Sequence, residues 1–297
     1  MFPSSCNLCP RGCGVDRNAG QTGFCGESAQ LHAARAALHM WEEPCISGEE
    51  GSGTVFFSGC TLRCVYCQNR AISTGQSGKY ISVQRLSDIF LELQQQGANN
   101  INLVTPDHFI PSIVPALKDA KARGLHLPIV YNSSSYVRVE SLRMLDGLID
   151  IYLPDLKYVS TELSARYSGA PDYFTHASAA IIEMVRQVGD AQFDDRDMMA
   201  RGVIVRHLLL PGCLTDSKAV VRWLWETFGD HIFLSLMSQY TPMPGLEGYP
   251  ELQRKITPEE YDALTDYALS LGVTQGFIQD GEAADESFIP PFDHQGI

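Results

Sequence analysis

The chain has 297 residues, of which 44% are hydrophobic and 19% are charged, a balance that favours a folded protein with a sizeable core over a disordered chain. Its formal net charge of −13 argues against a nucleic-acid partner, because so acidic a chain repels phosphates. No apolar run reaches the roughly 18 residues of a membrane span, and the N-terminus does not look like a secretory signal. We therefore expect a cytoplasmic protein without a membrane partner.

Residues 1–50 form a Cys-rich N-terminal segment, in which only residues 28–40 have a regular pattern, of helical type. From residue 51 onward, short apolar runs alternate with longer helical patterns. Strands are expected at 54–57, 101–104, 127–131, 148–153, 203–210 and 232–236. Helices are expected at 83–96, 110–123, 137–145, 174–189, 217–228 and 258–271. Residues 281–297 are predicted to be an irregular C-terminal tail.

This alternation predicts an α/β fold in which repeated βαβ units form a parallel sheet. About six units fit into residues 51–280, so an open or partial (β/α)6 TIM-like barrel suits the chain better than eight-fold closure. Loops at the carboxyl ends of the strands are then the expected place for catalytic residues.

Seven of the nine cysteines fall into two tight clusters. The first contains Cys6, Cys9, Cys13 and Cys25, and the second contains Cys60, Cys64 and Cys67. In a reducing compartment, such spacing indicates metal ligation rather than disulfides. Cys45 and Cys213 lie apart from both clusters, and we interpret them as small buried residues.

The second cluster directly follows the first strand of the α/β region. Three thiolates separated by gaps of three and two residues can hold one 4Fe–4S cluster. Because such a cluster takes four ligands, one iron remains open to a substrate or cofactor. The structural alternative is a zinc knuckle that takes a fourth ligand from elsewhere in the chain.

At these residues the sequence resembles the radical S-adenosylmethionine (SAM) superfamily, whose CxxxCxΦC signature is matched by Cys60, Cys64, Tyr66 and Cys67. The resemblance covers about residues 50–280 and is greatest to the proteins grouped with pyruvate formate-lyase activating enzyme. It implies that the three cysteines hold a 4Fe–4S cluster that chelates SAM. It also implies that Tyr66 lies against the SAM adenine.

The resemblance assigns further SAM contacts to strand ends. After the second strand the family usually has Gly-Gly-Glu, which binds the SAM amino group, but this chain has Val-Thr-Pro-Asp, with Thr105 offering a hydroxyl and a carbonyl. After the third strand, residues 131–134 resemble the Thr-Asn-Gly loop near the SAM ribose and carboxylate, which points to Asn132 and Ser134. An ordinary Asn/Ser turn is the alternative for this loop.

The fourth strand ends in an Asp-Leu-Lys segment similar to that of the activases, where the lysine meets SAM or the substrate peptide. Asp155 and Lys157 are two apart on a strand, so their side chains point the same way; a surface ion pair is the alternative. Arg206 lies inside the apolar fifth strand and needs a counter-charge, which the resemblance assigns to the SAM carboxylate. His207 faces the opposite side, and we expect it to be packed.

The first cluster supplies four thiolates within 20 residues, with glycines for tight turns. Such a ligand-complete site suits structural zinc, which would stabilise a segment with little core of its own. It suits an auxiliary 4Fe–4S cluster equally well, and we favour iron–sulfur. The expected role is electron relay or peptide docking.

The resulting hypothesis is an enzyme that receives one electron from a flavodoxin or ferredoxin and cleaves SAM to methionine and a 5′-deoxyadenosyl radical, which abstracts hydrogen from the substrate. The resemblance suggests that the substrate is a glycyl residue of a partner enzyme, as in an anaerobic glycyl-radical activase. One alternative is radical modification of a peptide or small molecule. The other is a non-catalytic iron–sulfur electron carrier or scaffold.

Overall fold

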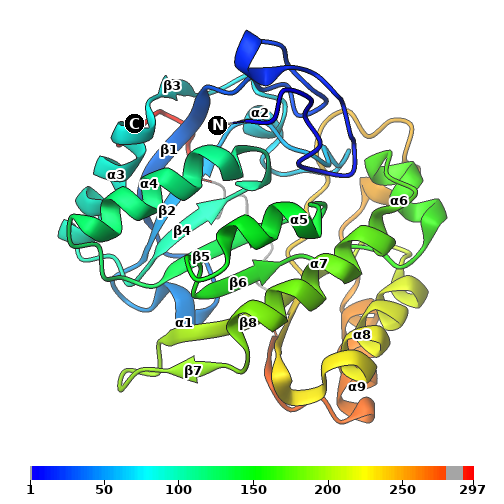
Figure 1. The fold of residues 1–297 in the computed structure, drawn as a ribbon. Coiled ribbons are helices and arrows are strands. Elements are labelled where there is room, and N and C mark those ends of the chain that lie inside the picture. The colour runs from blue at the N-terminus through cyan, green and yellow to red at the C-terminus, as the bar shows by residue number, and fades with distance from the viewer. Residues whose placement is uncertain (1, 279–289) are drawn as a thin grey trace.

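A curved sheet of mostly parallel strands forms the centre of the molecule (Figure 1). The computed structural model describes residues 2–278 and 290–297. The parallel strands that it describes are β2 (Ser52–Phe57), β4 (Ile101–Val104), β5 (Ile129–Ser133), β6 (Ile151–Pro154), β8 (Met199–Leu208), β9 (Phe233–Met237) and β10 (Gly276–Ile278). They are neighbours in this order, and the short β7 (Gln192–Phe193) pairs antiparallel with β8.

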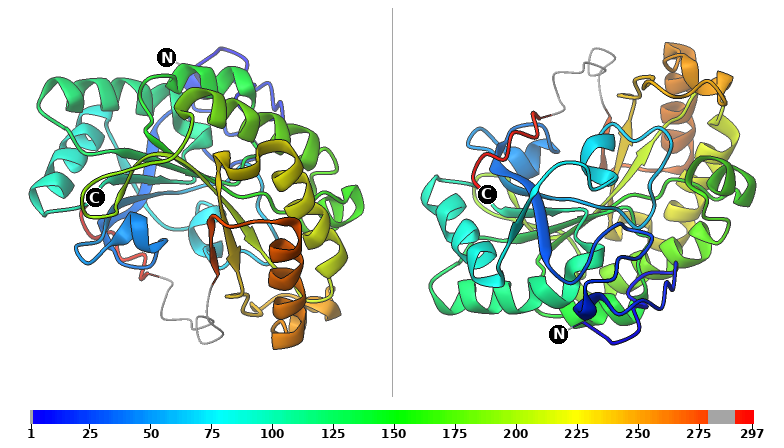
Figure 2. Two further views of the ribbon diagram at one scale, coloured as in Figure 1. Left: turned by 90° about the horizontal axis from the view of Figure 1, so that it is seen from below. Right: turned by 90° about the horizontal axis from the view of Figure 1, so that it is seen from above.

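Helices connect the parallel strands and lie along the outer side of the sheet (Figures 1 and 2). The longer ones are α3 (Val83–Gln95), α4 (Ile110–Ala122), α6 (Thr161–Ser168), α7 (Tyr173–Val188), α8 (Leu214–Phe228) and α9 (Pro258–Leu271). The four-residue helices are α1 (Pro44–Ser47), α2 (Arg70–Ser73) and α5 (Val139–Leu142). Single turns of 3₁₀-helix occur at Arg17–Ala19, Asp107–Phe109, Arg143–Leu145, Gly229–His231 and Pro250–Gln253.

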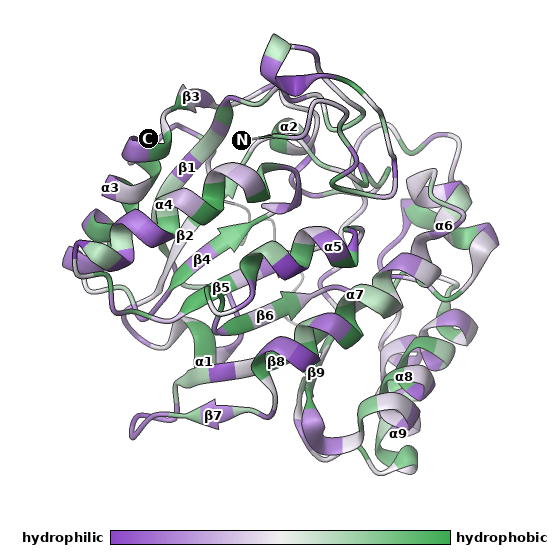
Figure 3. Ribbon diagram, in the orientation of Figure 1, coloured by the Kyte–Doolittle hydropathy of each residue, from purple (hydrophilic) through white to green (hydrophobic). Residues whose placement is uncertain are grey.

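Local sequence explains why these segments are helical. Helix α3 begins after Ser82, whose side chain accepts a hydrogen bond from the Arg85 N–H. Its buried residues, Leu86, Ile89, Phe90 and Leu93, recur at helical spacing and pack on the sheet. In Figure 3 the central strands are largely hydrophobic, whereas the helices carry both kinds of residue. The predicted α/β fold with a partial (β/α)6 barrel is confirmed.

The prediction of helix over residues 28–40 is wrong, because this segment contains strand β1 (Leu31–His39). Alanine favours helices when only local propensity acts. Here β1 pairs antiparallel with β2, from Ala33 opposite Phe57 to His39 opposite Ser52, and also with β3 (Lys79–Ile81). Ala33 is fully buried, so pairing and burial outweigh the helical propensity of the segment.

The C-terminal residues return to β1. The predicted tail at 281–297 lies partly outside the described residues, and its described part, 290–297, contains neither helix nor strand. The Ala36 N–H donates a hydrogen bond of 2.8 Å to the Gln295 carbonyl, and Arg35 forms an ion pair with Asp293. The C-terminal residues are thus attached to the antiparallel part of the sheet.

The N-terminal segment is attached to this core through arginines. Arg17, only 1% exposed, donates hydrogen bonds to the carbonyls of Ser28 and His108. Its guanidinium lies 4.4 Å from the centre of the Phe2 ring. Arg138 donates a hydrogen bond of 3.2 Å to the Cys9 carbonyl. These charge-assisted bonds hold a segment that has few apolar residues of its own.

The loop between α3 and β4 packs on β2 and leaves no room for a side chain at Gly53. A Cβ there would lie 2.8 Å from the Asn100 carbonyl oxygen and 2.9 Å from the Ala98 Cβ. We predict that Gly53→Ala lowers the free energy of unfolding by about 1–3 kcal/mol, the usual effect of overpacking, as measured by urea denaturation. Gly248→Ala is the matched control, because within the described part of the chain a Cβ at that position would have nothing within 4 Å; equal stability of the two variants would contradict the prediction.

Candidate active site

A cavity of about 250 Å³ opens at the carboxyl ends of the parallel strands. Parallel strands all end at the same edge, so residues far apart in sequence meet there. Every residue predicted to bind the catalytic cluster or SAM lines this cavity: Cys60, Cys64, Tyr66, Cys67, Thr105, Asn132, Ser134, Asp155, Lys157 and Arg206. The structure therefore brings the complete set together, while the role of each residue remains a prediction.

The three cysteines lie in the loop after β2. The Cys60 Sγ accepts hydrogen bonds from the N–H groups of Leu62 at 3.3 Å and Arg63 at 3.4 Å, and the Ser168 hydroxyl donates to the Cys64 Sγ at 3.1 Å. Burial, and to a smaller extent the other thiols, raises the pKa of Cys60 to about 12. Thiolates at this site therefore require a cation, which a metal cluster provides.

The arrangement of the thiols suits a cluster better than a single ion. Within residues 2–278 and 290–297, no three His, Cys, Asp or Glu side chains converge tightly enough to hold one metal ion. A 4Fe–4S cluster is larger than a single ion and takes its thiolates on separate irons. Three thiols spread around one cavity, with N–H groups directed at sulfur, fit such a cluster.

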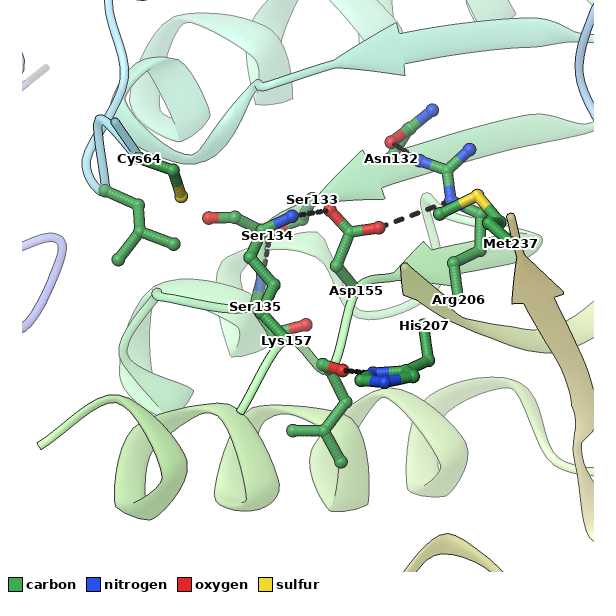
Figure 4. A network of polar contacts seen from close by, with 12 residues as sticks. Cys64, Asn132, Ser133, Ser134, Ser135, Asp155, Lys157, Arg206, His207 and Met237 are labelled. Carbon is green, nitrogen blue, oxygen red and sulfur yellow. Dashed lines mark hydrogen bonds and ion pairs between the residues drawn. The ribbon is translucent and has the colours of Figure 1, made fainter. Parts of the chain in front are cut away.

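Charged side chains lie across the cavity from the cysteine loop (Figure 4). The Lys157 Nζ lies 2.8 Å from the Asp155 Oδ2, and the Arg206 Nε lies 3.4 Å from the Asp155 Oδ1. Burial favours the neutral form of Asp155, but Lys157 and Arg206 outweigh it and hold its pKa below the usual value. Burial also opposes the charge of Lys157, yet Asp155 raises its pKa. The site thus keeps both signs of charge away from bulk water.

Sequence analysis missed Glu42, which lines the same cavity from the loop after β1. Its carboxylate accepts a hydrogen bond of 2.9 Å from the Arg206 Nη1 and another of 2.9 Å from the Asn102 Nδ2. Burial opposes the charge of Arg206, but Asp155 and then Glu42 raise its pKa above the usual value. The signal in the sequence is the acidic pair Glu42–Glu43 shortly after residues 31–39, a segment that is a strand and not a helix.

Arg206 and His207 point to opposite sides of β8, as expected from strand geometry (Figure 4). The buried Arg206 Nε makes no hydrogen bond with the described residues, but it faces the Asp155 Oδ1 in an ion pair of 3.4 Å. His207 is 1% exposed, and its Nδ1 donates a hydrogen bond of 2.7 Å to the Leu156 carbonyl. Burial lowers the pKa of His207 to about 4, which fits the expected packed histidine.

Tyr66 is held by other tyrosines. Its hydroxyl accepts a hydrogen bond of 2.6 Å from Tyr158. The rings of Tyr158, Tyr167 and Tyr240 lie edge-on to it, with centroids 6.3–6.5 Å away. Such packing fixes an aromatic surface at the cavity wall.

Thr105 has a strained backbone. Its φ of +57° lies in the left-handed region, which is unusual for a β-branched residue and costs about 1–3 kcal/mol. Its N–H donates a hydrogen bond of 2.9 Å to the Asn132 carbonyl, which holds the turn against the neighbouring strand. Strain of this kind is concentrated at ligand sites, and here it lies where the family usually has Gly-Gly-Glu.

The four N-terminal cysteines do not line the cavity. Burial raises the pKa of Cys9 to about 12, and the nearby thiols of Cys25, Cys13 and Cys6 raise it further. One tight turn has the Gly12 N–H bonded to the Cys9 carbonyl, and a wider loop is closed by the bonds from the Gly14 N–H to the Cys6 carbonyl and from the Cys6 N–H to the Val15 carbonyl. The thiols of Cys6, Cys13 and Cys25 thus lie near that of Cys9 without converging as ligands of a single ion, and the second metal site stays a prediction.

Comparison with known proteins agrees with this geometry. The family model of the radical SAM superfamily matches residues 54–219, more than half of the chain. The chain belongs to the radical SAM superfamily, which implies an enzyme with a 4Fe–4S cluster and SAM as cofactors.

Two relatives show where the similarity lies. An uncharacterized protein of Methanocaldococcus jannaschii is 27% identical over 271 residues, which are 89% of this chain and 74% of that protein. A pyruvate formate-lyase-activating enzyme of Staphylococcus epidermidis is 24% identical over 178 residues, which are 57% of this chain and 65% of that enzyme.

Among solved structures, Streptococcus suis SuiB bound to S-adenosylmethionine is similar, with a TM-score of 0.51 and 12% sequence identity. The match covers 75% of this chain and 48% of the SuiB chain, so this chain spans about half the length of SuiB. At this identity the likeness is one of fold. No helix in the described part of the chain is long and apolar enough to cross a membrane.

The pH dependence of stability tests the buried carboxyl of Asp107, which is bonded to Ser133 in the cavity wall. Asp107 is fully buried and accepts hydrogen bonds of 2.7 Å from Tyr131 and Ser133, while burial raises its pKa from 3.8 to about 6. As the pH rises, the Asp107 carboxyl loses its proton in the unfolded chain before it does so in the folded protein. Between pH 4 and 6 this carboxyl therefore lowers the free energy of unfolding progressively, by about 3 kcal/mol in total. We predict that the free energy of unfolding of Asp107→Asn does not show this decrease between pH 4 and 6.

Urea unfolding between pH 4 and 7.5 gives the measurement. The stability of Asp107→Asn relative to wild type should rise with pH by about 3 kcal/mol, and Asp195→Asn, at an exposed position, serves as the control for the same change of residue type. A difference between Asp107→Asn and wild type that does not depend on pH would refute the assignment.

Proposed function

We propose that this enzyme reductively cleaves SAM and directs the resulting radical at a glycyl residue of a partner protein. The observation that carries the proposal is the shared cavity, in which Cys60, Cys64 and Cys67 face the charged residues Asp155, Lys157 and Arg206. Membership of the radical SAM superfamily supports the chemistry. The similarity to pyruvate formate-lyase-activating enzyme over 57% of the chain supports the glycyl substrate.

Cys60, Cys64 and Cys67 would hold the 4Fe–4S cluster, because they supply three thiolates and leave one iron for SAM. When bound, the cluster and SAM together supply a radical able to abstract hydrogen. The protein contributes orientation and the exclusion of water. Burial around the thiols and the packed tyrosines around Tyr66 suit that task.

The charged residues would orient the methionine part of SAM, which carries a carboxylate and an ammonium group. Arg206 lines the cavity and keeps its positive charge beside Asp155 and Glu42, and a guanidinium suits the carboxylate. Asp155 stays ionised because Lys157 and Arg206 lower its pKa, so it suits the ammonium group. Thr105, Asn132 and Ser134 line the same cavity and complete the polar wall, while Tyr66 would stack on the adenine.

The four N-terminal cysteines would hold a second metal site, for which we favour a 4Fe–4S cluster over zinc. Its support is the gathering of Cys6, Cys9, Cys13 and Cys25 in one segment outside the cavity. The position suits electron relay from a flavodoxin or ferredoxin, or docking of the partner.

We predict that the anaerobically reconstituted protein forms 5′-deoxyadenosine from SAM and dithionite, detected by chromatography with mass detection. Replacing Cys60, Cys64 and Cys67 together by alanine should abolish the product, because no thiolate then remains at the cavity. The variant should also bind about four iron atoms fewer per chain. Iron that remains bound in it would belong to the N-terminal site, whereas zinc there would contradict our choice of metal.

Cys213→Ala is the matched control, because Cys213 is a buried cysteine that does not line the cavity. It should retain full 5′-deoxyadenosine formation. Absence of product from wild-type protein with an intact cluster would overturn the enzymatic proposal and favour an iron–sulfur carrier.

The glycyl substrate requires its own test. With pyruvate formate-lyase as the probe partner, reduced enzyme and SAM should generate an electron paramagnetic resonance signal of a glycyl radical on the partner. Deuterium at the glycine Cα of the partner should appear in 5′-deoxyadenosine, since hydrogen moves from that carbon to the nucleoside. A signal no stronger than that obtained with the triple alanine variant would contradict the glycyl substrate, as would efficient turnover of a free metabolite.

A further inference from the structure

Arg11 belongs to the N-terminal cysteine segment but makes its hydrogen bonds elsewhere. It lies between Cys9 and Cys13, and its Nε donates a hydrogen bond of 3.0 Å to the Thr61 carbonyl. Its Nη2 donates one of 3.2 Å to the Leu62 carbonyl. Both acceptors lie in the loop that carries the predicted catalytic cysteines.

The same guanidinium also reaches the end of α6. It donates hydrogen bonds to the carbonyls of Ser168, at 2.9 Å, and Gly169. Ser168 is the residue whose hydroxyl donates to the Cys64 Sγ. One side chain therefore fixes the backbone next to two of the three cavity thiols.

The bonds to Thr61 and Leu62 have a particular consequence for Cys60. The Thr61 carbonyl and the Leu62 N–H belong to one peptide unit, and the Leu62 carbonyl and the Arg63 N–H belong to the next. These two N–H groups are the donors to the Cys60 Sγ, at 3.3 and 3.4 Å. Each peptide unit thus accepts from Arg11 on one side and donates to the cysteine sulfur on the other.

These two peptide units connect the Arg11 guanidinium with the Cys60 Sγ, and the positive charge of Arg11 polarises both of them. A cationic donor at the carbonyl withdraws electron density from the amide, and this strengthens the N–H as a donor. Hydrogen bonds to cluster sulfurs and nearby positive charge stabilise the reduced, more negative state of an iron–sulfur cluster and so raise its reduction potential. Arg11 is therefore placed to act on a cluster that it does not touch.

The N-terminal segment holds Arg11 in this position. Its guanidinium lies 3.8 Å from the centre of the Phe24 ring, next to Cys25. The Arg63 guanidinium also lies near this ring, at 5.4 Å, so Phe24 contacts an arginine from each cysteine motif. Arg63 has a left-handed φ of +55°, a strained conformation that the surrounding contacts must maintain.

We propose that Arg11 is a positioning residue that holds the Cys60–Arg63 turn and raises the reduction potential of the cluster at Cys60, Cys64 and Cys67. The inference rests on the proposed function, because it takes that cluster to be the one at the cavity. It gives the four-cysteine segment a role in tuning the catalytic site through backbone hydrogen bonds.

The test is a redox titration in which electron paramagnetic resonance monitors the reduction of the cluster at Cys60, Cys64 and Cys67. It compares four reconstituted proteins: wild type, Arg11→Gln, Arg11→Lys and Arg138→Gln. In Arg11→Gln the equilibrium constant for one-electron reduction should fall about tenfold, equivalent to a potential about 59 mV lower. Arg11→Lys should recover part of this shift, because an ammonium keeps the charge but lacks the planar fork of the guanidinium. Arg138→Gln should match wild type, since Arg138 bonds to the Cys9 carbonyl and not to the turn.

Equal potentials in wild type and Arg11→Gln, at equal iron content, would overturn the inference. If Arg11→Gln fails to retain a cluster, amide hydrogen exchange of cluster-free protein decides: residues 60–64 should exchange several-fold faster in Arg11→Gln than in Arg138→Gln, and equal rates would refute the role of Arg11. A shifted potential together with no SAM cleavage by wild type would leave the inference standing while the proposed function fails.

Discussion

A guanidinium that is removed from water must have counter-charges and hydrogen-bond acceptors, and Arg206 is where this requirement joins the parts of the cavity. Its partners are Glu42 from the loop after β1, Asn132 from β5 and Asp155 from the end of β6. Breaking a buried ion pair by removing one partner typically costs about 3–5 kcal/mol. The pairing therefore holds the loop after β1, β5 and the end of β6 in one arrangement around the guanidinium.

The pairing also determines which groups in the cavity are charged. Asp155 is ionised because two cations lie beside it, and Lys157 keeps its proton because Asp155 lies beside it. The Cys60 thiol, in contrast, has no cation beside it that outweighs its burial, and burial raises its pKa to about 12. One side of the cavity thus carries the ion-paired side chains of Asp155, Lys157 and Arg206. The other side carries the cysteine thiols, which a bound metal cluster would convert to thiolates. This asymmetry suits a zwitterionic ligand held next to a metal cluster.

The N-terminal segment depends on a different kind of interaction. It has few apolar residues, so arginines bind it to the core through backbone carbonyls: Arg17 to His108, Arg138 to Cys9, and Arg11 to the turn after Cys60. These are directional bonds, which specify orientation more closely than apolar contact does. These bonds consequently fix the orientation of the segment relative to the loop that carries Cys60, Cys64 and Cys67.

Local sequence determined the alternation of strands and helices, the cysteine spacing after β2, and the polar residues at the strand ends, because periodicity and position on a strand are local properties. Short elements such as β3, β7 and β10 lack enough periods to be predicted. Tertiary structure alone decided that residues 31–39 form a strand, since their burial against β2 outweighs the preference of alanine for helices. It also decided that Glu42 meets Arg206, and that Arg11 bonds to peptide units next to Cys60. Each of these depends on contacts between distant residues, and no local pattern encodes which distant group will be near.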